Sequence, residues 1–169
     1  MIADPGLRVG MGFDVHPFAK GRPLVLGGVT IPHGAGLAGH SDADVLVHAV
    51  CDALLGAAAL GDIGRHFPDR DPAYRGISSL ELLRRTAGLL AAAGWRALQV
   101  DTCVLAEAPR IAPHEAAMQR GIAEALGIPA ANVGIKATTT EGLGFVGRRE
   151  GIAAQAICLL VRDRAAGEP

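Results

Sequence analysis

A strict alternation of apolar and polar or glycine positions runs from Leu7 to His16. Successive side chains of a strand point to opposite faces, so this pattern predicts a strand with one buried face. One side of it carries Val9, Met11, Phe13 and Val15, and the other side carries Gly10, Gly12, Asp14 and His16. Shorter apolar runs at 24–26 and 29–31, on either side of two glycines, predict a small hairpin.

Two helices are predicted where a capping pattern precedes helical periodicity. Ser41, with an aspartate three residues later, matches the capping box and predicts a helix over 41–60. Ser78, with a glutamate at the same spacing, precedes a second helix that runs to Gly94. The apolar stripe of this second helix consists of Leu80, Leu83, Ala87 and Leu90.

The second half of the chain adds one helix and three strands. Strands are predicted at Leu98–Ala106, Val133–Thr138 and Ile152–Val161, and a helix is predicted at Pro113–Gly127. The segment Gly142–Gly151, between the last two strands, is glycine-rich and basic. This order of elements predicts an α+β fold, in which a mixed sheet has helices packed on one face.

Several of the predicted strands are apolar on both faces, notably Ile152–Val161. The second face of the sheet then needs a cover, and a symmetric oligomer is the simplest source of one. The 169 residues fit one domain spanning 1–169, with flexible ends expected at 1–6 and 163–169.

Composition narrows the class of function. The formal net charge is -1 and aromatic residues make up 4%, which leaves neither a basic surface nor stacking platforms for nucleic acid. Met1–Gly6 lacks a signal-peptide pattern, and the most apolar run, Ala53–Leu60, is too short to span a membrane. Cys51, Cys103 and Cys158 are odd in number and widely spaced, so reduced core thiols and a cytoplasmic location are expected.

Asp14 and His16 are two residues apart on the first predicted strand, so their side chains project to the same side. The strand breaks at Pro17, which places the pair at the end of an element. Taken alone, this spacing is more typical of an unrelated surface aspartate and histidine. With His48 added, two nitrogens and one oxygen form a ligand set that zinc accepts, and a coordination position stays open as in catalytic zinc sites.

The start of the first predicted helix combines histidine, serine and acidic residues. A helix N-terminus offers free N–H groups that favour anions, so His40 and Ser41 lie where a phosphate is expected. Asp44 and Asp52 lie one turn to each side of His48, and either is expected to bind its second ring nitrogen. The alternative is a solvated acidic helix face with one incidental histidine.

Two further segments are candidate substrate-binding loops. Gly61–Gly64 exposes Asp62 in a tight turn that suits hydrogen bonds to hydroxyls, although ordinary turn chemistry explains these residues better. Lys136–Glu141 brings three threonines and a carboxylate to the end of a strand, ahead of glycines and arginines in 142–149. These groups suit a diphosphate, with Glu141 holding magnesium, and a polar surface hairpin is an equal alternative.

Taken together, these segments resemble the 2-C-methyl-D-erythritol 2,4-cyclodiphosphate synthase family of non-mevalonate isoprenoid biosynthesis. The resemblance extends over Arg8–Arg162 and rests on four blocks in the family's order. The blocks are Gly12–His16, His40–Asp44 with His48, Gly61–Gly64 and Lys136–Phe145.

The resemblance implies the family's α+β fold, assembled as a homotrimer with its sheets facing the three-fold axis and its active sites between subunits. It also implies the reaction of a phosphorus–oxygen lyase. In this reaction 4-diphosphocytidyl-2-C-methyl-D-erythritol 2-phosphate becomes 2-C-methyl-D-erythritol 2,4-cyclodiphosphate and CMP is released. The 2-phosphate attacks the β-phosphate, assisted by two divalent metals.

The same resemblance assigns roles to individual residues. The implied ligands of Zn²⁺, or a similar divalent cation, are Asp14, His16 and His48. Glu141 is implied to hold Mg²⁺ or Mn²⁺ with the substrate diphosphate, and the implied catalytic residues are His40 and Thr139. Segments 106–112 and 138–141 are implied to line the cytidine and diphosphate pocket. Substrate contacts are implied for Asp14, Val15, His16, His40, Ser41, Asp62, Ile63, Gly64, Phe67, Pro68, Asp69, Arg70, Asp71, Ala106, Glu107, Ala108, Pro109, Arg110, Ile111, Ala112, Thr138, Thr139, Thr140, Glu141, Phe145 and Arg148.

The chain departs from the family pattern at Gln155, where some relatives carry a glutamate that pairs with an arginine on the trimer axis. The partner of Arg148 is therefore open, and so is the binding of any lipid diphosphate in a central channel. Some relatives are fused to a cytidylyltransferase domain, for which this chain is too short, so cyclase activity alone is expected. The competing functions are a non-catalytic metal-binding trimer or ligand sensor, and a generic zinc phosphoesterase.

Overall fold

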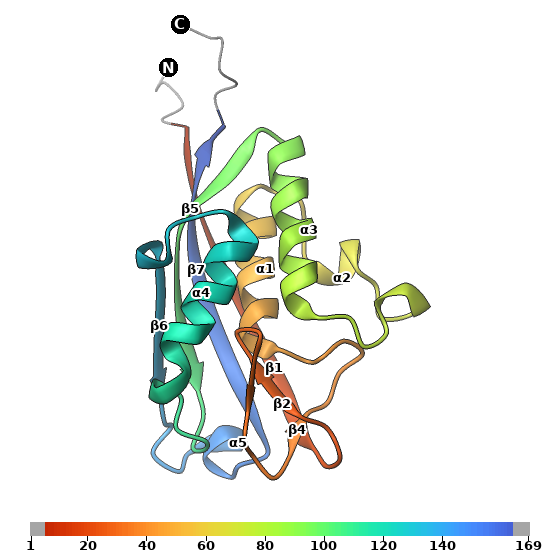
Figure 1. Cartoon of the computed structure of the whole chain (residues 1–169), viewed down its shortest axis with the longest axis vertical. Coiled ribbons are helices and arrows are strands. Elements are labelled where there is room, and N and C mark those ends of the chain that lie inside the picture. The colour runs from red at the N-terminus through yellow and green to blue at the C-terminus, as the bar shows by residue number, and fades with distance from the viewer. Residues whose placement is uncertain (1–5, 164–169) are drawn as a thin grey trace, which may run out of the picture.

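The fold is one mixed sheet with three long helices packed on one side (Figure 1). The computed structural model describes residues 6–163. The five-stranded sheet has the order β4-β1-β7-β5-β6, and a separate hairpin pairs β2 with β3. Strands β5 and β6 run parallel, and the other neighbouring strands run antiparallel. The predicted α+β fold class is therefore confirmed.

The bounds of the elements agree with the predicted order of strands and helices. The strands are β1 (Leu7–Ala19), β2 (Leu24–Leu26), β3 (Val29–Ile31), β4 (Gly36–Leu37), β5 (Trp95–Leu105), β6 (Val133–Thr138) and β7 (Gly151–Arg162). The helices are α1 (Val45–Ala57), α2 (Ile63–His66), α3 (Ser79–Ala92), α4 (Glu115–Leu126) and α5 (Gly144–Gly147), with 3-10 turns η1 (Pro72–Tyr74), η2 (Ala112–His114) and η3 (Ala130–Asn132). The short elements β4, α2 and α5 had no separate signal in the sequence pattern.

Helix α1 is shorter than predicted, because it covers Val45–Ala57 and not 41–60. Asp44, and not Ser41, caps the helix, since its side chain accepts a hydrogen bond from a backbone N–H three residues later. Ala43 has a left-handed backbone with φ 59°, which cannot belong to a right-handed helix. The segment that precedes the helix is therefore a loop, and it is available to build a site.

Helices α3 and α4 follow their predicted signals closely. Ser78 is the N-cap residue of α3, although its side chain makes no capping hydrogen bond. Helix α4 ends at Gly127, whose left-handed φ of 66° suits glycine at a helix terminus. Leu83 and Leu90 of the predicted apolar stripe are fully buried in the core beneath α3.

Strand β1 lies against α1 through its glycines. A Cβ atom on Gly10 would lie 2.0 Å from the carbonyl oxygen of Ala53, and one on Gly12 would lie 2.0 Å from that of Ala49. Only glycine allows the strand and the helix to approach this closely. The face of β1 that is buried within the chain is therefore the glycine side.

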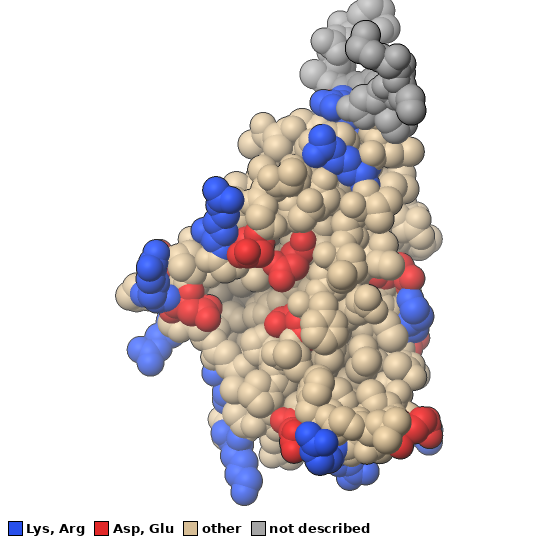
Figure 2. Space-filling model, turned by 180° about the vertical axis from the view of Figure 1, so that it is seen from behind, with Lys and Arg blue, Asp and Glu red and all other residues tan. Residues whose placement is uncertain are grey.

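The apolar side of β1 faces away from the helices and is exposed in the single chain. The exposed fractions are 46% for Leu7, 69% for Val9, 60% for Met11, 53% for Phe13 and 43% for Val15, with 48% for Ile157 of β7. Seen from behind, most of the surface over the sheet is uncharged (Figure 2). The strand buries one face, as predicted, but the larger apolar side chains are on the other one.

The two ends of the described segment are held by backbone hydrogen bonds. The N–H of Arg162 donates to the carbonyl of Gly6 at 2.8 Å, and the N–H of Asp163 donates to Gly94 at 2.9 Å. Gly6 and Asp163 belong to the segments 1–6 and 163–169 that were predicted to be flexible, and these hydrogen bonds involve their backbones. The remainder of the predicted flexible ends lies outside the described residues.

The structure also bears on the predicted thiols and membrane spans. Cys51 and Cys158 are buried and Cys103 is partly buried, and all three are free thiols, as predicted. Within residues 6–163, each helix is too short or too polar to cross a bilayer.

Candidate metal centre and the adjoining cleft

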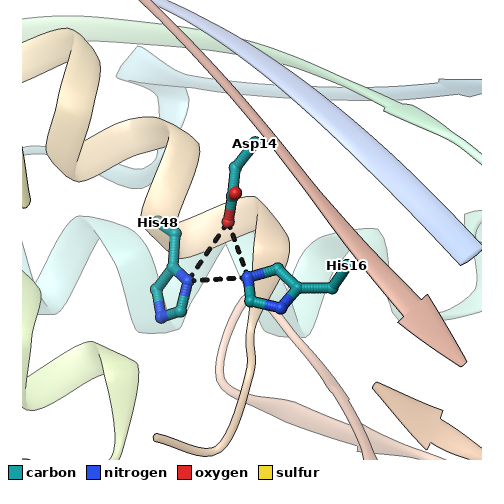
Figure 3. A group of neighbouring side chains, drawn as sticks. All are labelled: Asp14, His16 and His48. Atoms are coloured by element: carbon teal, nitrogen blue, oxygen red, sulfur yellow. Dashed lines mark hydrogen bonds and ion pairs between the residues drawn. The ribbon is translucent and has the colours of Figure 1, made fainter. Parts of the chain in front are cut away.

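Asp14, His16 and His48 form a compact cluster in which three side-chain atoms face one point (Figure 3). The Oδ2 atom of Asp14 lies 2.9 Å from Nε2 of His16 and 3.2 Å from Nδ1 of His48. The two ring nitrogens are 3.2 Å apart. The structure therefore brings together the three residues that the sequence singled out as a ligand set.

Two packed elements position this cluster. Asp14 and His16 project from the glycine side of β1, and His48 projects from the first turn of α1. The close approach at Gly12 sets the distance between the two elements, because a side chain there would collide with the backbone of α1. The geometry of the cluster thus depends on a residue that carries no functional group.

The electrostatics of the cluster favour positive charge. Burial raises the pKa of the Asp14 carboxyl, but its contacts with the His16 and His48 rings outweigh burial and hold that pKa well below its usual range. Burial lowers the pKa of His16, and its contact with Asp14 outweighs this effect, so the pKa of His16 is raised. The Asp14 carboxylate is ionised at neutral pH. Without a metal, its negative charge favours the protonated form of the His16 ring.

The outward-facing ring nitrogens contact a carbonyl and two hydroxyls. Nδ1 of His16 lies 2.5 Å from the carbonyl oxygen of Ala38. Nε2 of His48 lies 3.1 Å from Oγ of Ser41 and 3.0 Å from Oγ of Ser79. Each ring is therefore held from behind, which is the usual arrangement around metal-binding histidines.

The prediction that Asp44 or Asp52 holds the ring of His48 is wrong. Asp44 accepts hydrogen bonds from the backbone N–H groups of Gly27 at 3.0 Å and Gly28 at 2.6 Å, besides capping α1. Asp52 accepts from a backbone N–H at the start of α2 at 2.7 Å. Both carboxylates satisfy backbone donors that only the tertiary fold brings next to them.

The donor set fits a divalent cation. Two imidazole nitrogens and one carboxylate oxygen are the ligand number and type that catalytic zinc sites use, with a further position open to substrate or water. The group of possible metal ligands found within residues 6–163 consists of Asp14, His16 and His48, and it contains no cysteine. A structural zinc site would favour a fourth protein ligand, so the open three-ligand set points to a reactive site.

A cleft of about 570 Å³ opens beside the cluster. Of the residues predicted from the sequence, it is lined by Asp14, His16, His40, Ser41, His48, Ile63, Gly64, Phe67, Pro68, Asp69 and Arg70. Gly39, Tyr74 and Leu82 also line the cleft, and none of the three was predicted as a contact residue. Leu82 is not part of the predicted apolar stripe of α3, and Tyr74 ends the 3-10 turn η1, for which the sequence showed no motif.

Three predicted contact residues have other positions in the single chain. Asp62 caps α2, and its Oδ1 atom accepts from the backbone N–H of Arg65 at 2.9 Å. Asp71 caps η1, and its carbonyl oxygen lies 3.3 Å from Nε2 of His40. Val15 points to the exposed outer face of the sheet. None of these three side chains lines the cleft formed by residues 6–163.

The predicted segments 106–112 and 138–141 contact each other but do not line this cleft. Oε1 of Glu107 accepts from the backbone N–H of Thr140 at 2.9 Å, from its hydroxyl at 3.2 Å and from the N–H of Gly142 at 3.3 Å. These backbone hydrogen bonds lower the pKa of Glu107. One carboxylate thus fixes the loop that follows β6.

Within this loop, Thr139 and Glu141 are coupled. The hydroxyl of Thr139 donates to Oε1 of Glu141 at 2.7 Å. Glu141 has a left-handed backbone with φ 53°, a strained conformation for a residue other than glycine. The loop therefore presents a hydroxyl and a carboxylate together on an exposed surface.

A model of the YgbB family matches residues 7–161, nearly the whole described chain. The chain belongs to the YgbB family. A curated relative from Syntrophobacter fumaroxidans is 60% identical over 93% of this chain and 99% of its own length. One from Syntrophomonas wolfei is 61% identical over 91% of this chain and 98% of its own length. Both bear the name 2-C-methyl-D-erythritol 2,4-cyclodiphosphate synthase, which confirms the resemblance read from the sequence.

Solved structures with the YgbB fold superpose well on this chain. The bifunctional IspDF from Campylobacter jejuni is 44% identical with a TM-score of 0.89, over 92% of this chain and 42% of that one. A 2C-methyl-D-erythritol-2,4-cyclodiphosphate synthase with bound CDP is 38% identical with a TM-score of 0.83, over 90% of this chain and 99% of that one. The CDP complex of IspF from Plasmodium falciparum is 30% identical with a TM-score of 0.82, over 96% of this chain and 100% of that one.

In this member of the YgbB family, the partner of Arg148 is a neighbouring carboxylate. Nε of Arg148 lies 2.8 Å from Oε1 of Glu150, and Nη2 lies 3.1 Å from Oε2. Gln155 lies on the outer face of β7, where the sheet register places it opposite Phe13 and Cys103. The sequence did not identify the partner of Arg148, and in the structure that partner is Glu150 of the same chain.

Proposed function

We propose that this chain converts 4-diphosphocytidyl-2-C-methyl-D-erythritol 2-phosphate to 2-C-methyl-D-erythritol 2,4-cyclodiphosphate and releases CMP. This reaction belongs to the non-mevalonate pathway of isoprenoid precursor synthesis. The observation that carries the proposal is the open cluster of Asp14, His16 and His48, in a chain that is 60% identical to a synthase of that name over 99% of that synthase's length. The similarity to two structures with bound CDP supports a cytidine nucleotide as the leaving part of the substrate.

In this proposal, Asp14, His16 and His48 hold Zn²⁺ or a similar divalent cation at the edge of the cleft. A cation bound there supplies positive charge that offsets repulsion between the phosphate groups. His40 and Ser41 lie beside the cluster, ahead of the N-terminus of α1, where N–H groups favour anions. The Asp71 carbonyl orients the His40 ring, which stabilises charge on the reacting phosphate.

The chain needs to position phosphates more than it needs to move protons. The attacking 2-phosphate is already an anion, so the reaction requires no strong general base. The hydroxyl of Thr139 and its neighbours orient the diphosphate, and residues 106–112 receive the cytidine. Asp62 receives the erythritol hydroxyls.

Threonine hydroxyls orient phosphate oxygens but carry no charge that neutralises them. We therefore assign Glu141 to a second cation, Mg²⁺ or Mn²⁺, held jointly with the diphosphate. Magnesium is typically bound through one or two carboxylates together with substrate phosphates. The exposed carboxylate of Glu141, beside Thr139, has the position and chemistry for that role.

The proposed assembly is a homotrimer with sheets facing the three-fold axis. The cleft and the loop of Glu141 lie apart in one chain, so a second copy is needed to bring both groups to one substrate. The exposed apolar side of β1 offers the surface on which copies pack. Sedimentation equilibrium is expected to give three times the chain mass of 17.3 kDa at working concentrations. A stable monomer with full activity would refute the shared site.

The proposal also includes a cytoplasmic location, a small-molecule substrate, and no nucleic-acid or membrane partner. The net charge of -1 and the three free thiols support these assignments.

The test is incubation of the protein with the diphosphocytidyl substrate and Zn²⁺ plus Mg²⁺, with products resolved by phosphorus NMR. We expect CMP and a cyclic diphosphate in equal amounts, without inorganic phosphate. Inorganic phosphate in place of the cyclic product would indicate a zinc phosphoesterase. Binding of CDP without any turnover would indicate a sensor.

A further inference from the structure

We propose that Ser79, backed by Asp42, is a positioning residue that fixes the tautomer and the ring orientation of His48. The inference rests on the proposed metal site, because it concerns how this chain prepares one ligand of that site. Ser79 is the first residue of α3, 31 positions from His48, and the sequence pattern assigned no role to its side chain.

A series of contacts runs from the carboxylate of Asp42 through the hydroxyl of Ser79 to the imidazole of His48. Oγ of Ser79 lies 3.0 Å from Nε2 of His48 and donates a short hydrogen bond to Oδ1 of Asp42. The backbone N–H of Ser79 donates to the other carboxylate oxygen of Asp42 at 2.9 Å. Ser79 is fully buried, so water does not compete for these hydrogen bonds.

The number of hydrogens available to this series of hydrogen bonds decides the tautomer of His48. A serine hydroxyl has one hydrogen, and an ionised carboxylate only accepts. Because Ser79 gives its hydrogen to Asp42, it presents a lone pair to His48, and Nε2 of His48 must carry the ring proton. In the neutral imidazole, the other ring nitrogen, Nδ1, then keeps its lone pair for a cation, and this atom lies 3.2 Å from Oδ2 of Asp14. The ring is thereby prepared as a metal ligand through Nδ1.

Ser41 supplies a second contact of the same kind at a similar distance. Its Oγ lies 3.1 Å from Nε2 of His48 and accepts a hydrogen bond from the backbone N–H of Ala43 at 3.1 Å. The hydrogen of the Ser41 hydroxyl has no carboxylate acceptor in these contacts, so its direction is not fixed. Ser79 is therefore the hydroxyl that imposes the tautomer.

The start of α3 is consequently part of the metal site, although it contributes no ligand. Groups that orient a metal-binding histidine from behind typically change metal affinity by about 10–100-fold when they are removed. The same change should alter the tautomer of His48 in the metal-free protein. A residue with a merely structural role would not shift that proton.

The test compares Ser79→Ala with Ser78→Ala in the full-length protein. Ser78 is exposed and its side chain makes no capping hydrogen bond, so it is a matched control at the adjacent position. Two quantities are measured. The first is Zn²⁺ affinity by competition with a chromophoric chelator, and the second is the protonation of the two His48 ring nitrogens in metal-free protein by nitrogen NMR.

We expect Ser79→Ala to lose about 10–100-fold in Zn²⁺ affinity and to show a mixture of His48 tautomers. Ser78→Ala should keep wild-type affinity and the Nε2-protonated form. Equal Zn²⁺ affinity and an unchanged His48 tautomer in the two variants would overturn the proposal. A wild-type protein with the Nε2-protonated tautomer but no Zn²⁺ binding would sink the proposed metal site and leave the role of Ser79 standing.

Asp42→Asn provides a second variant in case Ser79→Ala does not fold. The asparagine oxygen can still accept from the backbone N–H of Ser79, which turns the NH₂ group toward the serine hydroxyl. The hydroxyl then accepts from Asn and donates to His48, so the ring proton should move to Nδ1. Persistence of the Nε2-protonated form in Asp42→Asn would contradict the inferred chain of hydrogen bonds.

Discussion

Replacement of Gly12 by alanine places a methyl group where strand β1 meets helix α1. The added Cβ would lie 2.0 Å from the carbonyl oxygen of Ala49 and 2.7 Å from the backbone nitrogen of Ala53. Real Cβ atoms essentially never come closer than 3.0 Å to another heavy atom, so the strand and the helix would have to separate by about 1 Å. Both colliding groups are helix backbone, which has no side-chain freedom with which to move aside.

The separation has two consequences that can be measured independently. Overpacking of this kind typically costs about 1–3 kcal/mol of unfolding free energy. It also moves Asp14 and His16 relative to His48, by much more than the roughly 0.2 Å that metal–ligand distances tolerate. We therefore expect Gly12→Ala to be destabilised by about 2 kcal/mol and to bind Zn²⁺ at least about tenfold more weakly.

The assay is urea unfolding followed by circular dichroism, at one protein concentration and with chelator present, together with Zn²⁺ titration of the folded variant. Gly56→Ala is the control, because a Cβ on this exposed residue of α1 meets nothing within 4 Å. Alanine is favoured over glycine inside a helix, so the control should gain about 0.5–1 kcal/mol. If Gly12→Ala were as stable as wild type and kept full Zn²⁺ affinity, the close approach would not be what sets the cluster geometry.

His48→Ala should lose most bound Zn²⁺ and most activity while it keeps its fold, and full metal content in the folded variant would refute the ligand assignment. Glu141→Gln should retain Zn²⁺, need much more Mg²⁺ for turnover and lose most of its rate at low Mg²⁺. An unchanged Mg²⁺ dependence would show that Glu141 holds no second cation. Burial raises the pKa of Cys51 to about 12 and that of Cys158 to about 11, above the ordinary 9.0, so at pH 8 roughly one thiol in a thousand or fewer is ionised at these two positions. A thiol reagent at pH 8 should therefore modify Cys51 and Cys158 only after denaturation, and fast reaction of either in the native protein would contradict their burial.

Local sequence signals determined the elements whose bounds depend on neighbouring residues. The hairpin around Gly27 and Gly28 and the strand Val133–Thr138 have the predicted bounds, and helix α4 ends where Gly127 adopts a left-handed conformation. Turn and termination preferences act within a few residues, so a single sequence contains them. The spacing of Asp14 and His16 likewise fixed their shared direction, because alternation is a property of one strand.

Helix α1 shows where local signals fail. The capping box at Ser41 was present in the sequence, yet Ala43 is left-handed and Asp44 caps the helix three residues later. The carboxylate of Asp44 is held by backbone donors from the hairpin, which approach it only in the folded chain. A capping pattern therefore identified the helix but not its first residue.

The sequence by itself determined which residues can bind a metal, while the tertiary structure decided how they are held. The side of β1 that packs on α1 is the glycine side, since close backbone packing there outweighs the burial of larger apolar residues on the other side. Ser79 reaches His48 from the start of another helix, and no spacing within one element encodes such a contact. Hydrogen bonds between distant segments depend on how whole elements pack, and packing is a property of the assembled core and not of any local pattern.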